Sequence, residues 1–495
     1  MKKVSIIGAG PGGLAAGLIL QSKGYEVEIF EKNPSVGGRT GSIKMEGYTF
    51  DVGPTFLMMV FILEEVFQKS GLDVRDYMEI KEVDPMYRLI YRGKDVLRLH
   101  RTDQEKMRKE LDGKFDDGYG NYQRFMEAET KKFNKILPSL KVPYTNVWDL
   151  LRKEILDATP YLDANVSLHQ RLSRFFDDED MKLAFTFQAK YLGMSPWDCP
   201  GTFSIISYIE HSGGIYHVMG GLNQLCVGMA NAFKDLGGTL HLNHEVEEIL
   251  VENRKAKGLR LTDGREVVSD EVIINSDFAY SMDHLIDEKN KKKYTPNRLK
   301  KKKYSCSIFM MYLGVDKVYD HLDHHNIFFA NDYKVNIDDI SMRKVLSQDP
   351  SVYIQNAVIT DKSLAPKGKS PLYVLVPVPN NTSGIDWEKE KAPFREKVLS
   401  ILETKAGLKD LREHIEVEKI TTPDDWEKEF HVYEGATFNL AHNIGQMLYF
   451  RPHNQFEEFH NCYLVGGGTH PGSGLPTIFQ SAMISSEMII KKDKS

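Results

Sequence analysis

The chain has 495 residues, of which 41% are apolar and 27% charged, so it can bury a sizeable core and form up to about three domains. Its formal net charge of −6 argues against general nucleic-acid binding. The longest apolar run, residues 56–63, is far shorter than the roughly 18 residues that a membrane-spanning helix needs. Lys2 and Lys3 precede a strand interrupted by glycine, which is unlike a signal peptide.

The cysteines lie far apart in the sequence and show no metal-binding spacing: Cys199, Cys226, Cys306 and Cys462. We expect free thiols in a reducing compartment rather than disulfides, and no metal site. The protein is therefore expected to be cytoplasmic, either soluble or associated with a membrane surface.

The amino-terminal residues carry the strongest local signal. A β-branched strand, residues 4–7, is followed at once by G-x-G-x-x-G in Gly8, Gly10 and Gly13. These glycines allow a tight turn, close approach of a pyrophosphate and close packing of the next helix, whose N-terminus can bind an anion. A second strand ends at Glu31, which can accept hydrogen bonds from both ribose hydroxyls of an adenosine. This order of elements predicts a dinucleotide-binding site. The alternative, a buried βαβ unit without a ligand, would not explain why an acidic residue, Glu31, stands at the end of the second strand.

Two glycine turns follow in the chain. Gly37-Gly38-Arg39 can line a cofactor and offer a guanidinium to a phosphate or a ring edge, and the alternative is a polar turn. A strand in 47–53 then closes in Pro54-Thr55.

Residues 60–230 show few strand patterns and many aromatic helical ones, with helices expected at 119–133, 147–156, 168–176 and 181–191. We interpret this stretch as a substrate or cap region inserted into the nucleotide domain. Residues 137–151 mix apolar side chains with Lys141 and nearby Arg152 and Lys153. They predict either a buried helix with a solvated face or a segment in a membrane interface.

The chain then returns to the nucleotide domain. A glycine-flanked strand around 215–219 and a helix to about 236 are followed by strands at 239–242, 245–251, 257–261, 265–268 and 272–274. A basic run in 289–303 predicts a solvated linker or a contact with anionic lipid. Strands at 305–315 and 372–376 are expected to wall the substrate site, and 394–405 is expected to be helical.

The carboxyl-terminal stretch repeats the arrangement of the first. A strand at 462–465, a glycine-rich loop at 466–476 and a helix at 478–491 follow one another. Because so many glycines are costly in chain entropy, a turn without function is the weaker interpretation. Two such units at opposite ends of the chain predict one long cofactor bound between them.

Nearly the whole chain resembles the carotenoid desaturase family of flavoproteins. The resemblance is carried by Gly8 to Gly13 with Glu31, Gly37-Gly38-Arg39, residues 50–55, Gly220-Gly221 and, most specifically, residues 467–476. Within the family the chain is most similar to the bacterial C30 enzymes, the diapophytoene (dehydrosqualene) desaturases. The resemblance implies FAD and an α/β fold, in which a Rossmann-type FAD-binding domain is interleaved with a substrate domain of mixed sheet and helical cap, as in flavin amine oxidases.

The resemblance also implies domains and site residues. Segments 1–60, 213–280 and 450–495 would form the FAD-binding domain, and 61–212 and 281–449 the substrate-binding, membrane-facing domain. Cofactor contacts are implied for Gly8, Gly10, Pro11, Gly12, Gly13, Glu31, Lys32, Gly38, Arg39, Thr40, Pro54, Thr55, Val246, Gly467, Gly468, Leu475 and Pro476. In that assignment Glu31 and the backbone of Val246 meet the adenosine, whereas Pro54, Thr55, Leu475 and Pro476 lie near the flavin ring.

The function implied is FAD-dependent desaturation of a C30 carotenoid precursor such as 4,4'-diapophytoene. Alternatives are a terminal methyl oxygenase of the diapolycopene type, a C40 phytoene desaturase, an amine oxidase and a flavin-free prenyl-binding protein. Thr469-His470-Pro471, where the oxygenases tend to have Asn-Pro, favours the desaturase. Two departures from relatives are the absence of an acid at Gly468 and Met59-Val60 in place of Met-Pro.

Such a reaction needs a hydride acceptor, which the flavin supplies, and an apolar channel for a lipophilic polyene drawn from a membrane. We expect the channel to be lined by Phe56, Leu57, Met58, Met59, Phe309, Met310, Phe328 and Phe329. His470 and Arg39 are the only titratable side chains expected near the flavin ring, and His470 is expected to orient rather than to accept a proton. The sequence therefore assigns no catalytic base. Oxygen or a quinone would take the electrons.

Overall fold

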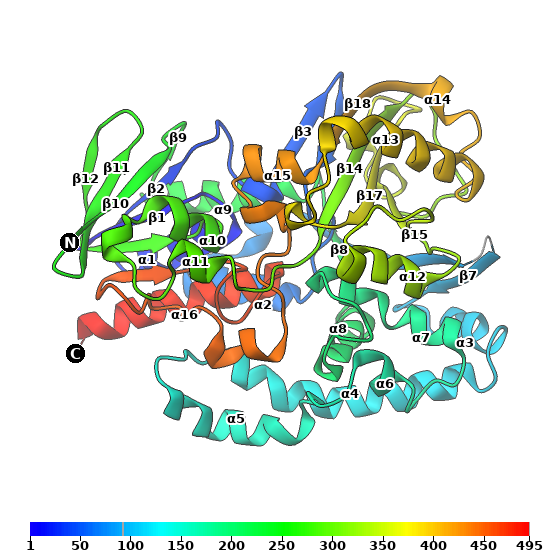
Figure 1. Cartoon of the computed structure of the whole chain (residues 1–495), viewed down its shortest axis with the longest axis horizontal. Coiled ribbons are helices and arrows are strands. Elements are labelled where there is room, and N and C mark those ends of the chain that lie inside the picture. The colour runs from blue at the N-terminus through cyan, green and yellow to red at the C-terminus, as the bar shows by residue number, and fades with distance from the viewer. Residues whose placement is uncertain (92–93, 495) are drawn as a thin grey trace.

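A five-stranded parallel sheet forms the half of the molecule that carries both chain ends (Figure 1). The computed structural model describes residues 1–91 and 94–494. The strand order is β19 (Cys462–Leu464), β13 (Glu271–Ile274), β1 (Lys3–Ile7), β2 (Glu26–Glu31) and β9 (Thr239–Leu242), and every neighbouring pair is parallel. In the register, Ile6 of β1 lies between Ile273 and Ile29. The apolar run of β1 is thus explained by a central strand buried on both faces.

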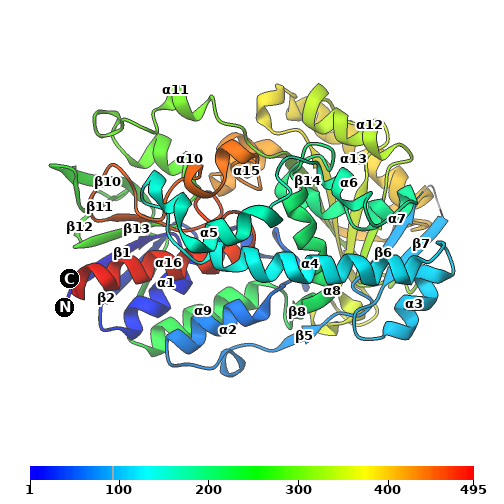
Figure 2. The same cartoon turned by 90° about the horizontal axis from the view of Figure 1, so that it is seen from below.

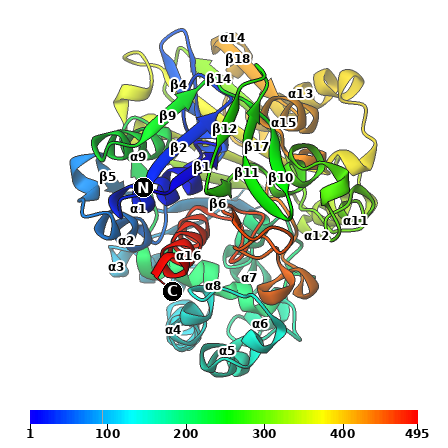
Figure 3. The ribbon, with the colours of Figure 1, turned by 90° about the vertical axis from the view of Figure 1, so that its left-hand side faces the viewer.

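Helices cover one face of this sheet and a small antiparallel sheet covers the other. The helices are α1 (Pro11–Ser22), α2 (Val60–Lys69), α9 (Asn223–Asp235) and α16 (Leu475–Lys494). The small sheet contains β10 (Val246–Glu252), β11 (Lys255–Leu261) and β12 (Glu266–Val268). Figure 3 shows α1 and α16 on one side of β1 and β2, with the two termini close together. An ion pair between Lys2 and Asp493 joins these ends.

A seven-stranded sheet forms the upper part of the other half (Figure 1). Its order is β18 (Ile415–Thr421), β14 (Ser307–Val315), β17 (Ser370–Val378), β16 (Val352–Asn356), β15 (His325–Phe328), β6 (Tyr87–Tyr91) and β7 (Lys94–Leu99). Only the β15–β6 pair is parallel among these neighbours. Two-stranded pairs are formed by β3 (Ser42–Met45) with β4 (Tyr48–Asp51), and by β5 (Ile80–Glu82) with β8 (Tyr216–Val218).

The expectation that strands are scarce in residues 60–230 is wrong for β6 and β7. The sequence of β6, Tyr-Arg-Leu-Ile-Tyr, has the β-branched and aromatic composition of a strand. Its partner β15 lies more than two hundred residues later in the chain, so no local hairpin pattern marked the parallel pair. Long-range pairing of this kind is invisible to a local pattern.

Helices make up most of the lower part of the molecule, and Figure 2 shows α4 running along it. They are α3 (Gln104–Asp112), α4 (Gly118–Leu140), α5 (Lys153–Ala158), α6 (Leu168–Leu172), α7 (Glu179–Ala184) and α8 (Ser204–Gly213). The helix expected at 147–156 is instead a 3-10 turn, Val147–Leu151, followed by α5. Arg152 separates them because its backbone is extended, with φ −63° and ψ 149°. The helices expected at 168–176 and 181–191 are likewise shorter, and Phe187–Leu192 is a 3-10 helix.

The remaining helices lie in both halves: residues 278–280 and 296–299 pack beside the small antiparallel sheet, and the others lie around the seven-stranded sheet. In chain order, these remaining helices are α10 (Phe278–Tyr280), α11 (Pro296–Leu299), α12 (Tyr333–Asp338), α13 (Trp387–Thr404), α14 (Leu411–His414) and α15 (Pro423–Phe430). None of the helices in the described part of the chain has both the length and the apolar character required to cross a bilayer. The division into two interleaved domains stays a prediction.

Candidate active site

One cavity of about 430 Å³ lies between the two large sheets, within the size range of small-molecule sites. Gly10 and Gly12 line it from the amino-terminal loop, and Gly467 and Gly468 line it from the carboxyl-terminal loop. The prediction that the two ends of the chain meet at a single site is therefore confirmed. All of the implied cofactor residues except Gly13 line this cavity: Gly8, Gly10, Pro11, Gly12, Glu31, Lys32, Gly38, Arg39, Thr40, Pro54, Thr55, Val246, Gly467, Gly468, Leu475 and Pro476.

The amino-terminal glycines make room for backbone and neighbouring side chains. Gly8 has a φ of +97°, in the region that favours glycine. A Cβ on Gly12 would lie 2.6 Å from Oδ1 of Asn275, and a Cβ on Gly13 would lie 2.2 Å from the carbonyl oxygen of Gly8. Gly13 therefore serves the packing of α1 on β1, whereas Gly8, Gly10 and Gly12 face the cavity.

The beginning of α1 is suited to an anion. Pro11 opens the helix, and the N-cap residue Gly10 has no side chain to bond the first-turn N–H groups. Those groups have no acceptor within the helix, and the helix dipole places partial positive charge there. Such a helix end can bind an anion, and the diphosphate contact expected from the sequence stays a prediction.

We expect Gly13→Ala to lower the free energy of unfolding by about 1–3 kcal/mol, because its Cβ cannot fit against the Gly8 carbonyl without moving α1. The same shift would weaken binding of the FAD that the resemblance implies. Chemical denaturation and FAD titration measure both effects. Gly24→Ala is the control, because a Cβ at Gly24 meets nothing within 4 Å and the effect there is limited to its positive φ. Equal stability of Gly13→Ala and the wild type would contradict the packing role.

Glu31 lies at the end of β2 and is buried at the cavity wall. Its Oε2 accepts a hydrogen bond from the Ala9 N–H at 2.9 Å, and its Oε1 accepts from the backbone and side-chain amides of Asn33. A carboxylate has roughly four acceptor positions, so capacity remains for a hydroxyl. The contact with an adenosine ribose stays a prediction.

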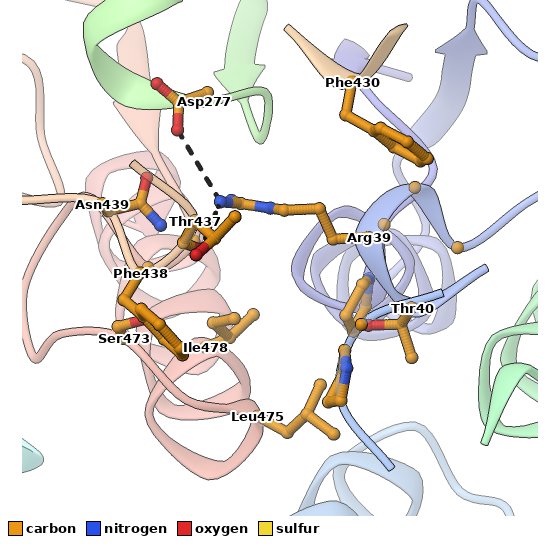
Figure 4. Close-up of a pocket in the computed structure, with 18 of the residues that line it drawn as sticks. Arg39, Thr40, Asp277, Phe430, Thr437, Phe438, Asn439, Ser473, Leu475 and Ile478 are labelled. Carbon is orange, nitrogen blue, oxygen red and sulfur yellow. Dashed lines mark hydrogen bonds and ion pairs between the residues drawn. The ribbon is translucent and has the colours of Figure 1, made fainter. Parts of the chain in front are cut away.

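Arg39 extends across the cavity from the 3-10 turn Gly38–Thr40 toward Asp277 (Figure 4). Its Nη1 donates to the carbonyl oxygen of Thr437 at 3.1 Å and lies 3.8 Å from Oδ2 of Asp277. The side-chain amide of Asn439 is oriented so that its nitrogen donates to Oδ2 of Asp277 at 2.7 Å. Its oxygen then accepts a hydrogen bond from the Arg39 guanidinium. Burial raises the pKa of Asp277 above its ordinary value, and Arg39 opposes that shift. The guanidinium is thus held inside the cavity with one weak ion pair.

The carboxyl-terminal loop is fixed by backbone geometry and by one buried arginine. A Cβ on Gly468 would lie 2.4 Å from Cβ of Phe278, which explains why this chain has no acid at that position. Arg451 is fully buried and donates to the carbonyl oxygens of Gly467, Thr469, Gln446 and Leu440. No carboxylate is among these partners. Arg451 therefore fastens the glycine-rich loop to the segment before β19.

The apolar part of the cavity differs from the predicted channel. Of the eight predicted residues, only Phe56 and Met58 line the cavity. Leu57, Phe309, Met310, Phe328 and Phe329 are buried in the hydrophobic core, and Met59 packs against it.

Strand alternation explains much of this error. Ile308 and Ile327, which each precede a predicted residue, line the cavity, whereas Phe309 and Phe328 point to the opposite face of the seven-stranded sheet. The wall also contains other apolar side chains, namely Phe187, Val352, Leu375 and Phe438.

His470 does not line the cavity, so the expectation that it lies beside the flavin ring is wrong. Its ring is fully buried and contacts Tyr144 edge to face at 4.7 Å between centroids. Burial lowers its pKa to about 3, so the imidazole is neutral. Arg39 is also not alone, because several titratable side chains share the cavity wall: Glu31, Lys32, Glu245, Asp277, Tyr280, Tyr353, Tyr373 and His431.

Comparison with known proteins agrees with this architecture. A family model described as "Flavin containing amine oxidoreductase" matches residues 11–490. A "4,4'-diapophytoene desaturase (4,4'-diapolycopene-forming)" from Methylomonas sp is 51% identical over 493 residues, covering 100% of this chain and 96% of that protein. A "zeta-carotene-forming phytoene desaturase" from Myxococcus xanthus is 35% identical over 491 residues, covering 99% and 94% of the two chains.

This chain belongs to the carotenoid desaturases of the flavin-containing amine oxidoreductase family. Among solved structures, a putrescine oxidase bound to putrescine has a TM-score of 0.62 at 15% identity, covering 100% of this chain and 99% of that one, which shows the shared fold. The predicted α/β fold, the oxidoreductase class and FAD as cofactor of this carotenoid desaturase are confirmed.

The cavity of this carotenoid desaturase fits an FAD molecule by its own features. The N-terminus of α1 has no side-chain cap, and a Cβ on the neighbouring Gly12 would clash. The Arg39 side chain lines the same cavity. Gly38 leaves open space, because a Cβ there would meet nothing within 4 Å. A diphosphate between two sugars matches such a row of backbone donors and one guanidinium.

Sequence reasoning missed several polar cavity residues of this carotenoid desaturase. Asn275 and Asp277 follow the carboxyl end of β13, the strand beside β1. Ligands of parallel sheets bind at the carboxyl ends of the strands, so this position could have identified both residues as part of the site. Tyr280 and His431 stack at 4.3 Å between ring centroids. His431 lies just after α15, where no periodic pattern marks a site.

Proposed function

We propose that this enzyme desaturates a C30 carotenoid precursor, such as 4,4'-diapophytoene (dehydrosqualene), to a conjugated polyene. The observation that carries the proposal is the similarity to the Methylomonas enzyme along the whole chain, since that enzyme is named for this substrate. The apolar wall that continues from the glycine-rich loops supports it, because a hydrocarbon must reach the cofactor without water. Bound FAD would supply the acceptor for a hydride.

The residues of the chain then have the following roles in the proposal. Pro11 and the glycines at the start of α1, with Arg39 and Thr40, bind the diphosphate. Glu31, Lys32 and the backbone of Val246 hold the adenosine. Gly467 and Gly468 contact the ribityl chain, and Asp277 supplies the carboxylate that relatives often carry at the position of Gly468. Pro54, Thr55, Leu475 and Pro476 lie at the flavin ring.

Expression in hosts that make colourless C30 or C40 polyenes tests this function. We expect coloured C30 products without aldehyde or acid end groups, identified by absorption and mass. Oxygenated ends would instead identify a terminal oxygenase, and colour only in the C40 host would identify a phytoene desaturase. Absence of colour in both hosts, with the protein present and yellow, would overturn desaturation.

We further propose that an exposed apolar patch contacts the membrane that holds the substrate. The patch is formed by Val147, Trp148, Leu151, Leu156, Ile444 and Phe450. Trp148 is 74% exposed, and the 3-10 turn that carries it contacts the turn Leu448–Phe450. Lys153 is exposed nearby at the start of α5, on the lower side of the molecule in Figure 1. Trp next to cations is typical of a membrane interface.

The buried-helix interpretation of residues 137–151 is wrong for the turn Val147–Leu151, which leaves three of its apolar side chains exposed, whereas residues 137–140 form the end of α4. The basic run in 289–303 is partly used inside the fold. Lys291 is buried and donates to the carbonyls of Met282 and Asp283, and Lys293 pairs with Glu457. Lys303 is exposed and its backbone N–H donates to Gln446, which places it near the patch.

We expect Trp148→Glu to weaken binding to phospholipid vesicles by about 10-fold or more, because the variant loses a large interfacial ring and gains a charge. Sedimentation with vesicles measures the effect, while the FAD content should stay unchanged. Val268→Glu is the matched control, because Val268 is 77% exposed on β12, away from the patch. Equal loss in both variants would contradict this docking surface.

A further inference from the structure

Tyr353 places a hydroxyl group on the apolar side of the cavity. It projects from β16 and lines the cavity together with Ile327 and Leu375. Its hydroxyl lies 2.8 Å from Oγ1 of Thr55 and 2.7 Å from Nδ1 of His325. Thr55 is one of the residues proposed to lie at the flavin ring. A part-buried hydroxyl with two hydrogen-bond partners thus lies beside the position proposed for the flavin ring.

His325 is held behind Tyr353, away from the cavity. Its ring packs against the rings of Phe56 and Tyr87 at 5.5 and 5.8 Å. Within residues 1–91 and 94–494, its Nε2 has no hydrogen-bond partner. An N–H is tolerated against aromatic faces, so we assign the proton to Nε2 and leave Nδ1 as the acceptor. Tyr353 then donates to His325, and Thr55 donates to Tyr353.

Both groups are neutral before reaction. Burial lowers the pKa of His325 to about 3, with a smaller contribution from His217. Burial also raises the pKa of the Tyr353 hydroxyl far above its ordinary value. Neither group places a charge beside the hydrocarbon in the resting cavity.

A row of histidines continues from His325 to a carboxylate. The ring of His324 lies 4.3 Å from that of His325 and 5.1 Å from that of His217. Nε2 of His217 lies 3.2 Å from Oδ2 of Asp361. Burial alone would raise the pKa of Asp361, but hydrogen bonds from Ser363, Gly220 and His217 bring it below its ordinary value. His324 itself pairs with Thr360 and Gln355, so the ionised Asp361 would stabilise positive charge in this group of rings through its field rather than through a chain of hydrogen bonds.

We propose that Tyr353 is the catalytic residue that accepts the proton lost by the polyene and that passes its own hydroxyl proton to His325. The inference rests on the desaturation proposed above. One C–H bond of the substrate breaks as its hydrogen leaves with both electrons for the flavin, which is reduced. The neighbouring C–H bond gives its electron pair to the new C=C bond and its proton to the Tyr353 oxygen. The original O–H proton moves to Nδ1 of His325, so the polyene loses two electrons and two hydrogens in total.

The test is anaerobic mixing of the FAD-loaded enzyme with 4,4'-diapophytoene in vesicles, with flavin bleaching followed in a single turnover. We expect Tyr353→Phe to slow bleaching by about 100-fold or more, since it removes a proton acceptor but keeps the ring. FAD affinity and melting temperature, measured in parallel, report on folding. Tyr312→Phe is the matched control, because Tyr312 is a buried tyrosine of β14 that bonds the carbonyl of Val52 at 2.6 Å, outside the cavity lining. It should react at the wild-type rate.

His325→Asn separates proton transfer from simple positioning. Its amide oxygen can take the place of Nδ1 and still accept a bond from Tyr353, but it cannot take the proton. We expect slow bleaching in this variant, and wild-type bleaching would overturn the transfer to His325.

A polyene deuterated at the carbon that loses the proton gives a second readout. In Tyr353→Phe the isotope effect on bleaching should rise, because proton loss becomes rate-limiting. A wild-type rate or an unchanged isotope effect in Tyr353→Phe would overturn the role of Tyr353. If no polyene bleaches the wild-type flavin, the proposed function itself fails.

Discussion

Replacing Arg39 with glutamate is expected to give a folded protein that retains almost no FAD. The guanidinium lies inside the cavity, where it has a 3.8 Å ion pair with Asp277 and a hydrogen bond to the Thr437 carbonyl, and its remaining donors can bind a diphosphate. Glutamate would remove those donors and add repulsion. We expect the dissociation constant for FAD to rise by about 100-fold or more, which is roughly 3 kcal/mol. Titration of flavin-stripped protein, followed by flavin fluorescence, measures it.

Two variants bracket this result. Arg39→Lys keeps the charge but not the planar fork, so it should bind FAD with intermediate affinity. Arg75→Glu is the charge-matched control, because Arg75 is 74% exposed and its guanidinium bonds Glu64 on the surface. FAD affinity of Arg39→Glu equal to that of Arg75→Glu would contradict the assignment.

Replacing Arg451 with methionine is expected to cost about 3 kcal/mol or more in the free energy of unfolding. The side chain is fully buried and its N–H groups satisfy four carbonyl oxygens from two segments, which methionine would leave without donors. Because one of these carbonyls belongs to Gly467 in the cofactor loop, FAD affinity should fall as well. Chemical denaturation of the variant with and without FAD measures both.

Arg75→Met again serves as the control, since it removes an exposed arginine of the same size. Arg451→Lys should rescue little, because an ammonium group has three donors for four carbonyl oxygens and lacks the extended fork of the guanidinium. A stability of Arg451→Met equal to that of Arg75→Met would show that the buried guanidinium does not fasten the loop.

The parts of the fold that the sequence predicts well are those with local signals. Adjacent residues predict a strand, a glycine loop, a helix and a second strand that ends at Glu31. The structure contains these elements as β1, α1 and β2. The glycine-rich stretch before α16 is equally local. Two similar strand–loop–helix units at the chain ends predicted a single site between their glycine loops. The structure confirms this prediction, because both loops border one cavity.

The rest depends on contacts between distant parts of the chain. Choosing Ile308 over Phe309 required knowledge of which face of β14 meets the cavity, which a strand buried on both faces does not reveal. Tyr353 and His325 belong to neighbouring strands whose pairing no local pattern marks. His470 lies in the most specific motif of the sequence, yet the fold turns it toward Tyr144. A motif identifies a segment, and packing decides which side chain faces the ligand.

In the proposed reaction, one FAD held between the two ends of the chain takes the hydride from a polyene in the adjoining apolar cavity. Simultaneous recording of flavin bleaching and polyene absorbance, without oxygen, tests it most directly. We expect one flavin to be reduced for each double bond formed from 4,4'-diapophytoene in a single turnover. Formation of conjugated product with the flavin still oxidised would contradict it.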